Sequence, residues 1–185
     1  SSCWTDTLAR AAGRRGHREE IGGKRMSESH PLAGHPRVNA DPEVCAAYAA
    51  DASGLVRVPD AVARPESEDE VAELLRLCAA KRISVTPQGL RSSTTGAAVA
   101  AEGIVLSLEK MNRMLQVDPE RCTAAAEPGI VTADFKRQVR AAGLFYPLDP
   151  TSEEECTLGG TVACNASGSR SYRYGPTRPY VRSLR

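Results

Sequence analysis

The sequence predicts an α/β fold, because short strand-like runs alternate with helical patterns along the chain. Its 185 residues suit one domain, and the 41% hydrophobic and 25% charged residues are those of an ordinary globular protein. Aromatic residues make up only 4%, so the core must come mainly from Val, Leu, Ile and Ala packed between helices and strands.

Charge and cysteine usage exclude several classes of function. A formal net charge of +1, with acids and bases interleaved through most of the chain, gives no field that would gather nucleic acid or an anionic membrane. No apolar run approaches the roughly 18 residues that span a bilayer, and no secretory signal is visible. The six cysteines show neither a CxxC pair nor metal-ligand spacing. We therefore expect a soluble, unexported, cytoplasmic protein with reduced thiols, no metal and no nucleic-acid partner.

Residues 1–40 are expected to form a poorly ordered tail, because arginines, glycines and prolines stand there without a sustained apolar period. A mobile tail, a mitochondrial transit peptide and a natural start at Met26 all stay open, although Glu19 and Glu20 disfavour a transit peptide. The histidines fall in this stretch and are expected to be surface or disordered residues without a catalytic or metal role: His17, His30 and His35.

The first elements are expected from Asp41. The spacing of Pro42, Val44, Cys45 and Tyr48 indicates a helix within a lead-in segment, residues 41–54. The main domain, residues 55–185, then opens with a brief strand over 55–58, where apolar residues alternate with polar ones.

The clearest helix follows Pro65. Ser67 is a candidate N-cap with Glu70 as its capping-box partner, and an apolar stripe runs to Cys78. The β-branched run 83–86 predicts a strand that leads into a loop of small residues.

Further elements are expected beyond this loop. Strands are predicted over 104–108 and 122–126, and the second of them ends at a Glu-Pro-Gly turn. Thr132 is expected to cap a helix that Gly143 ends. The stretch 147–175 is turn-rich, and residues 180–184 are expected to begin a strand.

The loop after the strand 83–86 has the composition of a phosphate site. It reads Pro87-Gln88-Gly89-Leu90-Arg91-Ser92-Ser93-Thr94-Thr95-Gly96-Ala97. A diphosphate needs several donors converging on a small volume, and consecutive backbone N–H groups with Ser and Thr hydroxyls supply them. Neither a Walker ending nor a GxGxxG fingerprint is present, so a phosphate bound here would use another kind of loop. A plain connector is the alternative.

A second glycine-containing stretch follows Asp149-Pro150-Thr151-Ser152 and runs from Cys156 to Gly168. Its paired glycines would let backbone amides contact a planar ring at van der Waals distance, while Thr157 and Asn165 can hydrogen-bond the polar edge of that ring. A buried structural turn is the alternative. Two such loops in one short domain favour a bound cofactor.

The order of these motifs resembles the FAD-binding domain of the vanillyl-alcohol oxidase (PCMH-type) superfamily, in its glycolate oxidase subunit and D-lactate dehydrogenase branch. The resemblance implies an α/β (α+β) fold of two small subdomains with FAD between them, C-terminally incomplete. It begins at about residue 50 and reaches the last residue. The matching segments are 87–98, 111–119, 126–129, 149–152 and 158–175.

Carried onto this sequence, the resemblance assigns the FAD pyrophosphate to a cradle within Pro87, Gln88, Gly89, Leu90, Arg91, Ser92, Ser93, Thr94, Thr95 and Gly96. It places Pro150, Thr151 and Ser152 along the flavin and Thr157 and Gly160 at the isoalloxazine. Asn165, Ser167 and Gly168 would border the cofactor. It implies non-covalent FAD, because the first loop holds no His or Cys, and Cys156 is expected to be buried and inert.

The cradle departs from the family pattern at three positions. Gln88, Leu90 and Arg91 stand where the family commonly has Arg, Ala or Gly, and Gly, so the cradle has more side chain to accommodate. The Arg91 side chain could turn toward phosphate or face solvent.

The resemblance implies the FAD-binding part of an oxidoreductase that oxidises the CH–OH group of a 2-hydroxy acid. No residue in 50–185 stands out as the catalytic base, which we expect with a substrate-binding cap domain in a region beyond Arg185. The chain therefore reads as an N-terminal fragment without activity of its own, and neither loop specifies the electron acceptor.

Three alternatives stay open. The chain could come from another superfamily member, such as an alkyl-dihydroxyacetone-phosphate synthase or a sugar or aromatic alcohol oxidase. It could be a flavin-binding module or subunit that a partner subunit completes. It could also be an α/β domain in which both loops are structural.

Overall fold

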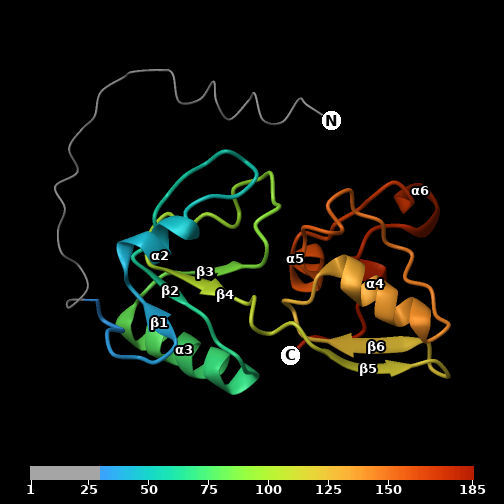
Figure 1. Ribbon diagram of the computed structural model, residues 1–185, viewed down its shortest axis with the longest axis horizontal. Helices are drawn as coiled ribbons and strands as arrows, with labels where there is room; N and C mark the ends of the chain where they lie inside the picture. The colour runs from blue at the N-terminus through green and yellow to red at the C-terminus, as the bar shows by residue number, and fades with distance from the viewer. Residues whose placement is uncertain (1–29) are drawn as a thin grey trace.

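The computed structural model describes residues 30–185, in which two lobes lie side by side (Figure 1). Residues 30–108 form the first lobe and residues 109–185 the second. The chain passes from one to the other after β4 (Ile104–Ser107) and before β5 (Met114–Asp118). The mixture of sheets and helices confirms the predicted α/β class and the division into two small subdomains.

A four-stranded sheet in the order β1-β2-β4-β3 forms the centre of the first lobe. The central strand β4 runs parallel to both β2 (Ala61–Ala63) and β3 (Val85–Gln88). Every residue of β2 and β4 is buried, as a parallel sheet covered on both faces requires. Alternate side chains pack on opposite faces: Ile104 and Leu106 lie in the cluster with α3, and Val105 lies in the cluster with Tyr48.

The helices α2 (Pro42–Ala47) and α3 (Glu68–Lys81) cover these two faces (Figure 1). Both were predicted. Asp41 caps α2 by accepting hydrogen bonds from the amides of its first turn. Ser67 caps α3, since its hydroxyl accepts from the Glu70 amide at 3.3 Å.

The capping box of α3 is not closed as expected. The Glu70 carboxylate accepts from the Glu66 amide at 2.7 Å and from Arg37 Nε at 2.9 Å, so it reaches past Ser67. The Glu66 amide, followed by Arg37, lowers the pKa of Glu70. This contact ties the helix start to the chain before β1 (Val38–Asn39).

The expected tail is wrong for residues 30–40, which pack on the first lobe. Leu32 lies in the core at 3% exposure, and β1 pairs antiparallel with β2. His30 is buried, contrary to the surface position expected; burial lowers its pKa, and its Nδ1 accepts from the Leu32 amide at 3.2 Å. Residues 1–29, with His17, lie outside the described part of the chain.

The strand expected over 55–58 is also wrong. Only an isolated bridge between Ala50 and Val56 forms there, and Leu55, Val56 and Val58 are each more than half exposed. The strand of this region is β2, which begins a few residues later. The strand predicted over 83–86 exists but is shifted, since β3 covers Val85–Gln88.

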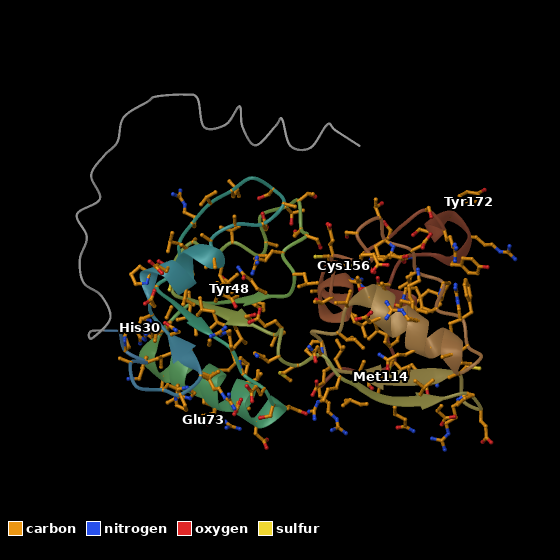
Figure 2. All side chains as sticks on the ribbon, viewed as in Figure 1. His30, Tyr48, Glu73, Met114, Cys156 and Tyr172 are labelled. Carbon is orange, nitrogen blue, oxygen red and sulfur yellow. The ribbon has the colours of Figure 1, made fainter. Side chains whose placement is uncertain are left out.

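The second lobe is a hairpin covered by a helix. β5 and β6 (Thr123–Ala126) pair antiparallel, and α4 (Thr132–Ala141) packs over them (Figures 1 and 2). The buried cluster of this lobe contains Phe135 and Val139 of α4 and Ile130, which precedes the helix. The predicted helix is confirmed with one correction: Val131 is the N-cap, and Thr132 is the first helical residue. Gly143, at φ +80°, follows the helix end as expected.

The turn-rich end of the chain contains more helix than the sequence indicated. It includes α5 (Leu158–Ala163), α6 (Ser171–Tyr174) and a 3-10 turn, η1 (Arg178–Tyr180). The strand expected at 180–184 is absent from the described residues, because the chain after η1 is irregular. None of the helices in residues 30–185 has both the length and the apolar character to cross a bilayer.

Candidate functional site

The first candidate loop leaves the carboxyl end of β3 and returns to β4. Pro87 and Gln88 are the last residues of β3 and not part of the loop itself. Because β2, β3 and β4 are parallel, their carboxyl ends share one edge of the sheet. That edge is where open α/β sheets bind ligands.

The backbone of this loop offers unpaired donors. The amides of residues 89–94 donate no hydrogen bond to any acceptor within residues 30–185. The loop is instead fixed from within and at its ends: the Ser93 and Thr95 hydroxyls lie 2.9 Å apart, and Val99 N donates to Gly96 O at 3.1 Å. Consecutive free amides can bind an anion where they converge, so this segment can supply donors for a diphosphate.

The Arg91 side chain stacks on the Tyr48 ring. Its guanidinium lies 5.1 Å from the centre of the Tyr48 ring, and its carbonyl accepts from the Ala52 amide at 3.1 Å. Its φ is +61°, a left-handed conformation that glycine adopts without strain. A glycine would therefore relieve backbone strain at this position. The Leu90 side chain beside it is 43% exposed.

Gln88 departs from its predicted place in the cradle. The side chain is 2% exposed and turns under the loop, where its Nε2 donates to the carbonyls of Tyr48 and Ala98. Sequence reasoning missed both partners, because a backbone carbonyl leaves no signal in the sequence.

The paired glycines of the second loop belong to a helix. Thr157 caps α5, with its Oγ1 accepting from the Gly160 amide at 3.2 Å, so Gly159 and Gly160 form the first helical turn. Gly159 faces inward: its amide donates to Pro128 O at 2.8 Å, and an added Cβ would lie 2.7 Å from the Pro128 Cβ. At Gly160 an added Cβ would meet only Thr157 Oγ1 within 4 Å, so this residue presents an open face.

The two loops meet although they come from different lobes. A Cβ added to Gly89 would lie 2.3 Å from Thr157 Oγ1, so the start of the first loop touches the N-cap of α5. In Figure 2 the labelled Cys156, which precedes Thr157, lies at the edge of the second lobe nearest the first. Cys156 is buried as expected, and its thiol donates to Thr132 Oγ1 at 3.3 Å.

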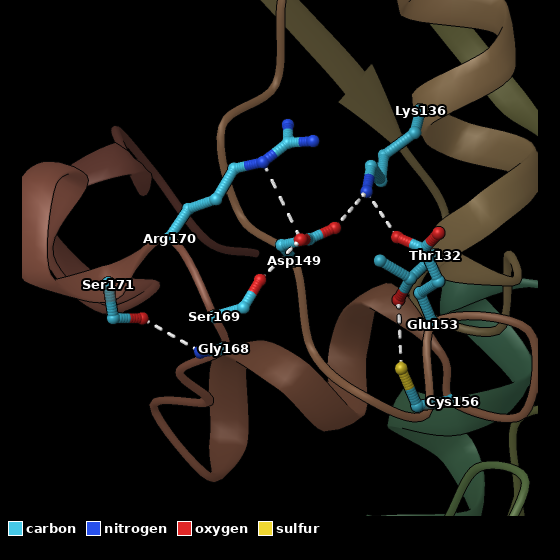
Figure 3. Close-up of polar contacts among 9 residues, drawn as sticks. All are labelled: Thr132, Lys136, Asp149, Glu153, Cys156, Gly168, Ser169, Arg170 and Ser171. Atoms are coloured by element: carbon cyan, nitrogen blue, oxygen red, sulfur yellow. Dashed lines mark hydrogen bonds and ion pairs between the residues drawn. The ribbon is translucent and has the colours of Figure 1, made fainter.

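A polar network fixes the segment 149–152 (Figure 3). Lys136 Nζ donates to Asp149 Oδ1 at 3.0 Å and also contacts the Glu153 carboxylate. The other Asp149 oxygen accepts from Ser169 Oγ at 2.7 Å and lies 3.5 Å from Arg170 Nε. The Ser169 hydroxyl and then Lys136 lower the pKa of Asp149; burial would lower the pKa of Lys136, but its hydrogen bonds to the two carboxylates raise it.

The residues after α5 close this network from the other side. A Cβ on Gly168 would lie 1.7 Å from Asp149 O, so only glycine fits where these two backbones cross. Asn165 adopts a left-handed φ of +47°, and its Oδ1 accepts from the Arg178 amide at 2.9 Å. Gly168 and Asn165 therefore stabilise the fold whether or not a ligand is bound.

The predicted site residues thus fall into two groups. In one group, Gly89 at the start of the first loop meets Thr157, the N-cap of the helix turn that contains Gly160. The other group lies within the second lobe and contains Pro150, which is buried, Thr151, which is exposed, Ser152, Asn165, Ser167 and Gly168.

Two open hollows lie away from the first loop and from the start of α5. One, of about 400 Å³, borders His30 and the start of α2. The other, of about 440 Å³, lies at α6 and is lined by Phe145, Ser169, Arg170, Tyr172, Arg173 and Tyr174.

Comparison with known proteins identifies one family. The model of the FAD binding domain family matches residues 59–185. The chain is 40% identical over 128 residues to the glycolate oxidase subunit GlcD of Bacillus subtilis, covering 69% of this chain and 27% of that protein. It is 39% identical over 127 residues to the D-lactate dehydrogenase of Anaerostipes hadrus, covering 68% of this chain and 26% of that protein.

Two further relatives extend the comparison. The D-2-hydroxyglutarate dehydrogenase of Stutzerimonas stutzeri is 33% identical over 162 residues, which is 86% of this chain and 35% of that protein. A solved structure of alkyldihydroxyacetonephosphate synthase superposes with a TM-score of 0.70 at 25% identity, over 77% of this chain and 32% of that one. The chain therefore spans about a quarter to a third of the length of the curated relatives.

Proposed function

The chain belongs to the FAD binding domain family, and we propose that it is the FAD-holding part of an oxidoreductase acting on the CH–OH group of a 2-hydroxy acid. The names of three relatives support this substrate class, because glycolate, D-lactate and D-2-hydroxyglutarate are all 2-hydroxy acids. We further propose that FAD is bound without a covalent link, since the loop 87–97 contains no His or Cys.

The observation that carries the cofactor site is the meeting of the first loop with the start of α5. The free amides of residues 89–94 supply donors for a diphosphate, and Gly160 leaves room for a planar ring beside them. Gly89 and Thr157 join these two features in one place. A site with phosphate donors at one end and an open helix turn at the other suits a ligand that has both a diphosphate and a ring system.

Each part of the chain has a distinct role in this proposal. The amides of 89–94 would donate hydrogen bonds to the phosphates, while the Arg91 guanidinium stacks on Tyr48. The network around Asp149 would hold Pro150, Thr151 and Ser152 in position along the ring. Bound FAD supplies a two-electron acceptor for the hydroxy acid. Asn165, Ser167 and Gly168 would border the cofactor through their backbone.

A second superfamily activity is less well supported. The likeness to alkyldihydroxyacetonephosphate synthase is at 25% identity, whereas the hydroxy-acid enzymes reach 33–40%. The sequence relatives therefore favour oxidation of a hydroxy acid. We also propose a reducing location such as the cytoplasm, because the five cysteines of the described residues are free, with Cys45, Cys78 and Cys156 buried.

Titration of the purified chain with FAD, followed by flavin fluorescence and with FMN and AMP as competitors, tests the cofactor proposal. We expect saturable binding in which FAD is preferred to FMN. Gly160→Val should weaken FAD by about tenfold or more, because its side chain enters the open face. Ala163→Val, an exposed position in the same helix, controls for the cost of a β-branched residue. Equal affinities of the two variants would remove Gly160 from the site, and a folded wild-type chain that takes up no FAD would contradict the proposal.

A further inference from the structure

Gln88 is a polar residue in an apolar position. It ends a strand whose neighbour, β4, is buried throughout, yet it carries an amide at 2% exposure. Its Oε1 has no partner within residues 30–185, and neither does the buried hydroxyl of Ser107, its register partner on β4. Burying unpaired polar atoms disfavours folding, so an apolar side chain would suit the sheet better. Departures of this kind are expected where a residue serves function.

The amide of Gln88 connects the two ends of the first loop. Gln88 stands immediately before the loop, and Ala98, whose carbonyl accepts from its Nε2, stands where the loop returns. The same Nε2 donates to Tyr48 O at 3.0 Å, at the end of α2. One side chain therefore fixes the span of the loop and its position on the lobe.

We propose that Gln88 is a positioning residue that preforms the phosphate loop, holding its free amides together before any ligand arrives. That the ligand is FAD rests on the proposed function, whereas the ordering of the loop by Gln88 does not depend on it. The Gln88 amide is neutral and the Arg91 guanidinium stacks on the Tyr48 ring, so we expect the loop amides to be the main hydrogen-bond donors to a phosphate. Affinity then depends on how well those amides are preorganised.

The test compares Gln88→Leu with Ser107→Ala. Leu keeps the burial and removes the amide, and Ser107 is a matched control because it lies opposite in the register at 1% exposure. Three quantities are measured on the 185-residue chain: backbone 15N order parameters of residues 89–97 without FAD, the Kd for FAD, and the thermal midpoint without FAD. In Gln88→Leu we expect the loop order parameters to fall from about 0.85 to below about 0.6 and Kd to rise by about tenfold. In Ser107→Ala the loop order parameters should match those of wild type and Kd should stay within about twofold.

The outcomes separate this inference from the proposed function. If Gln88→Leu lowers only the thermal midpoint, with loop order parameters and Kd equal to those of Ser107→Ala, Gln88 is merely structural and the inference is overturned. If the wild-type chain binds no FAD, the proposed function fails, and the loop order parameters still decide whether Gln88 orders the loop. Should Gln88→Leu not fold, Gln88→Met replaces it, since the unbranched Met side chain has a similar length and no hydrogen to donate, with the same result expected.

Discussion

The two lobes are stabilised in different ways. In the first lobe, β2 and β4 are buried along their whole length and have an apolar cluster on each face. In the second, no residue of β5 or β6 is buried, and the hairpin is held by contacts such as the pair between Arg113 and Glu127 and by the network around Asp149. The lobe that carries the phosphate loop thus buries its sheet between two apolar clusters, whereas the lobe that carries α5 has one apolar cluster under α4 and adds polar contacts and close backbone packing.

The largest expected effect comes from the core of the first lobe. Leu74→Ala should reduce the free energy of unfolding by about 2–5 kcal/mol, because Leu74 is 1% exposed and its truncation leaves a cavity. Leu115→Ala should stay within about 0.5 kcal/mol of wild type, because Leu115, on β5, is 60% exposed. Urea unfolding of both variants provides the measurement, and similar losses would show that the hairpin is as well buried as the central sheet.

The second lobe should be most sensitive at its backbone crossings. Gly168→Ala should cost about 1–3 kcal/mol, because its Cβ would lie 1.7 Å from Asp149 O and the backbone must move. Gly160→Ala should stay within about 1 kcal/mol of wild type, since its Cβ would meet only Thr157 Oγ1, at 3.2 Å, and Ala favours a helix. Thermal unfolding of the two variants tests this difference; a tolerated Gly168→Ala would mean that the crossing adjusts easily.

Acid should weaken the second lobe through Glu127. The hydrogen bond from Arg113, at 2.6 Å, outweighs burial and lowers the pKa of Glu127 from its ordinary value of 4.5. Folding therefore favours the ionised form of Glu127. The stabilisation from this carboxylate is fully present above about pH 4.5 and is lost as the pH falls through the lower pKa of the folded state. Glu127→Gln should lose about 1–2 kcal/mol at pH 7 and show a smaller loss on acidification. Urea unfolding at pH 7 and at lower pH measures the loss at neutral pH and the loss on acidification. If the variant and the wild type lose equal stability in acid, other carboxylates cause the acid sensitivity.

The smallest expected effect concerns Arg91, a charged residue in the lobe that is stabilised mainly by apolar burial. Arg91→Gly removes the contact with the Tyr48 ring, which costs stability, and relieves the strain of a φ of +61°, which adds stability. Each of these two opposing free energies is about 1 kcal/mol. The free energy of unfolding should therefore change by less than about 1 kcal/mol. A loss well above this value would show that Arg91 and Tyr48 contribute much more to the first lobe than a surface stacking pair.

Local signals explain which elements the sequence could predict. The cap at Ser67 and the apolar stripe of α3 lie within one stretch of chain, and the four apolar or small residues of β4 form one run. β2 and β6 are rich in alanine, which is a poor strand former, and β2 was missed because only its pairing with β4 makes it a strand. The apolar residues of 55–58 alternate like a strand, but they have no partner and remain exposed.

The candidate site divides in the same way. The free amides of the first loop could be predicted because small residues stand together there. The helix around Gly159 and Gly160 could not, since glycines argue against a helix and the Thr157 cap is its one local signal. The contact between Gly89 and Thr157, and the turn of Gln88 beneath its loop, depend on segments distant in the sequence.

The order of the strands along the chain bears on how the protein is made. All four strands of the first sheet lie before residue 108, and the hairpin strands of the second lobe lie after it. During synthesis the first lobe can therefore complete its sheet and bury both apolar faces while the second is still unmade. The second lobe then folds beside a surface that is already formed. Its residues Gly129 and Thr157 pack against Leu108 and Gly89 of the first lobe, respectively.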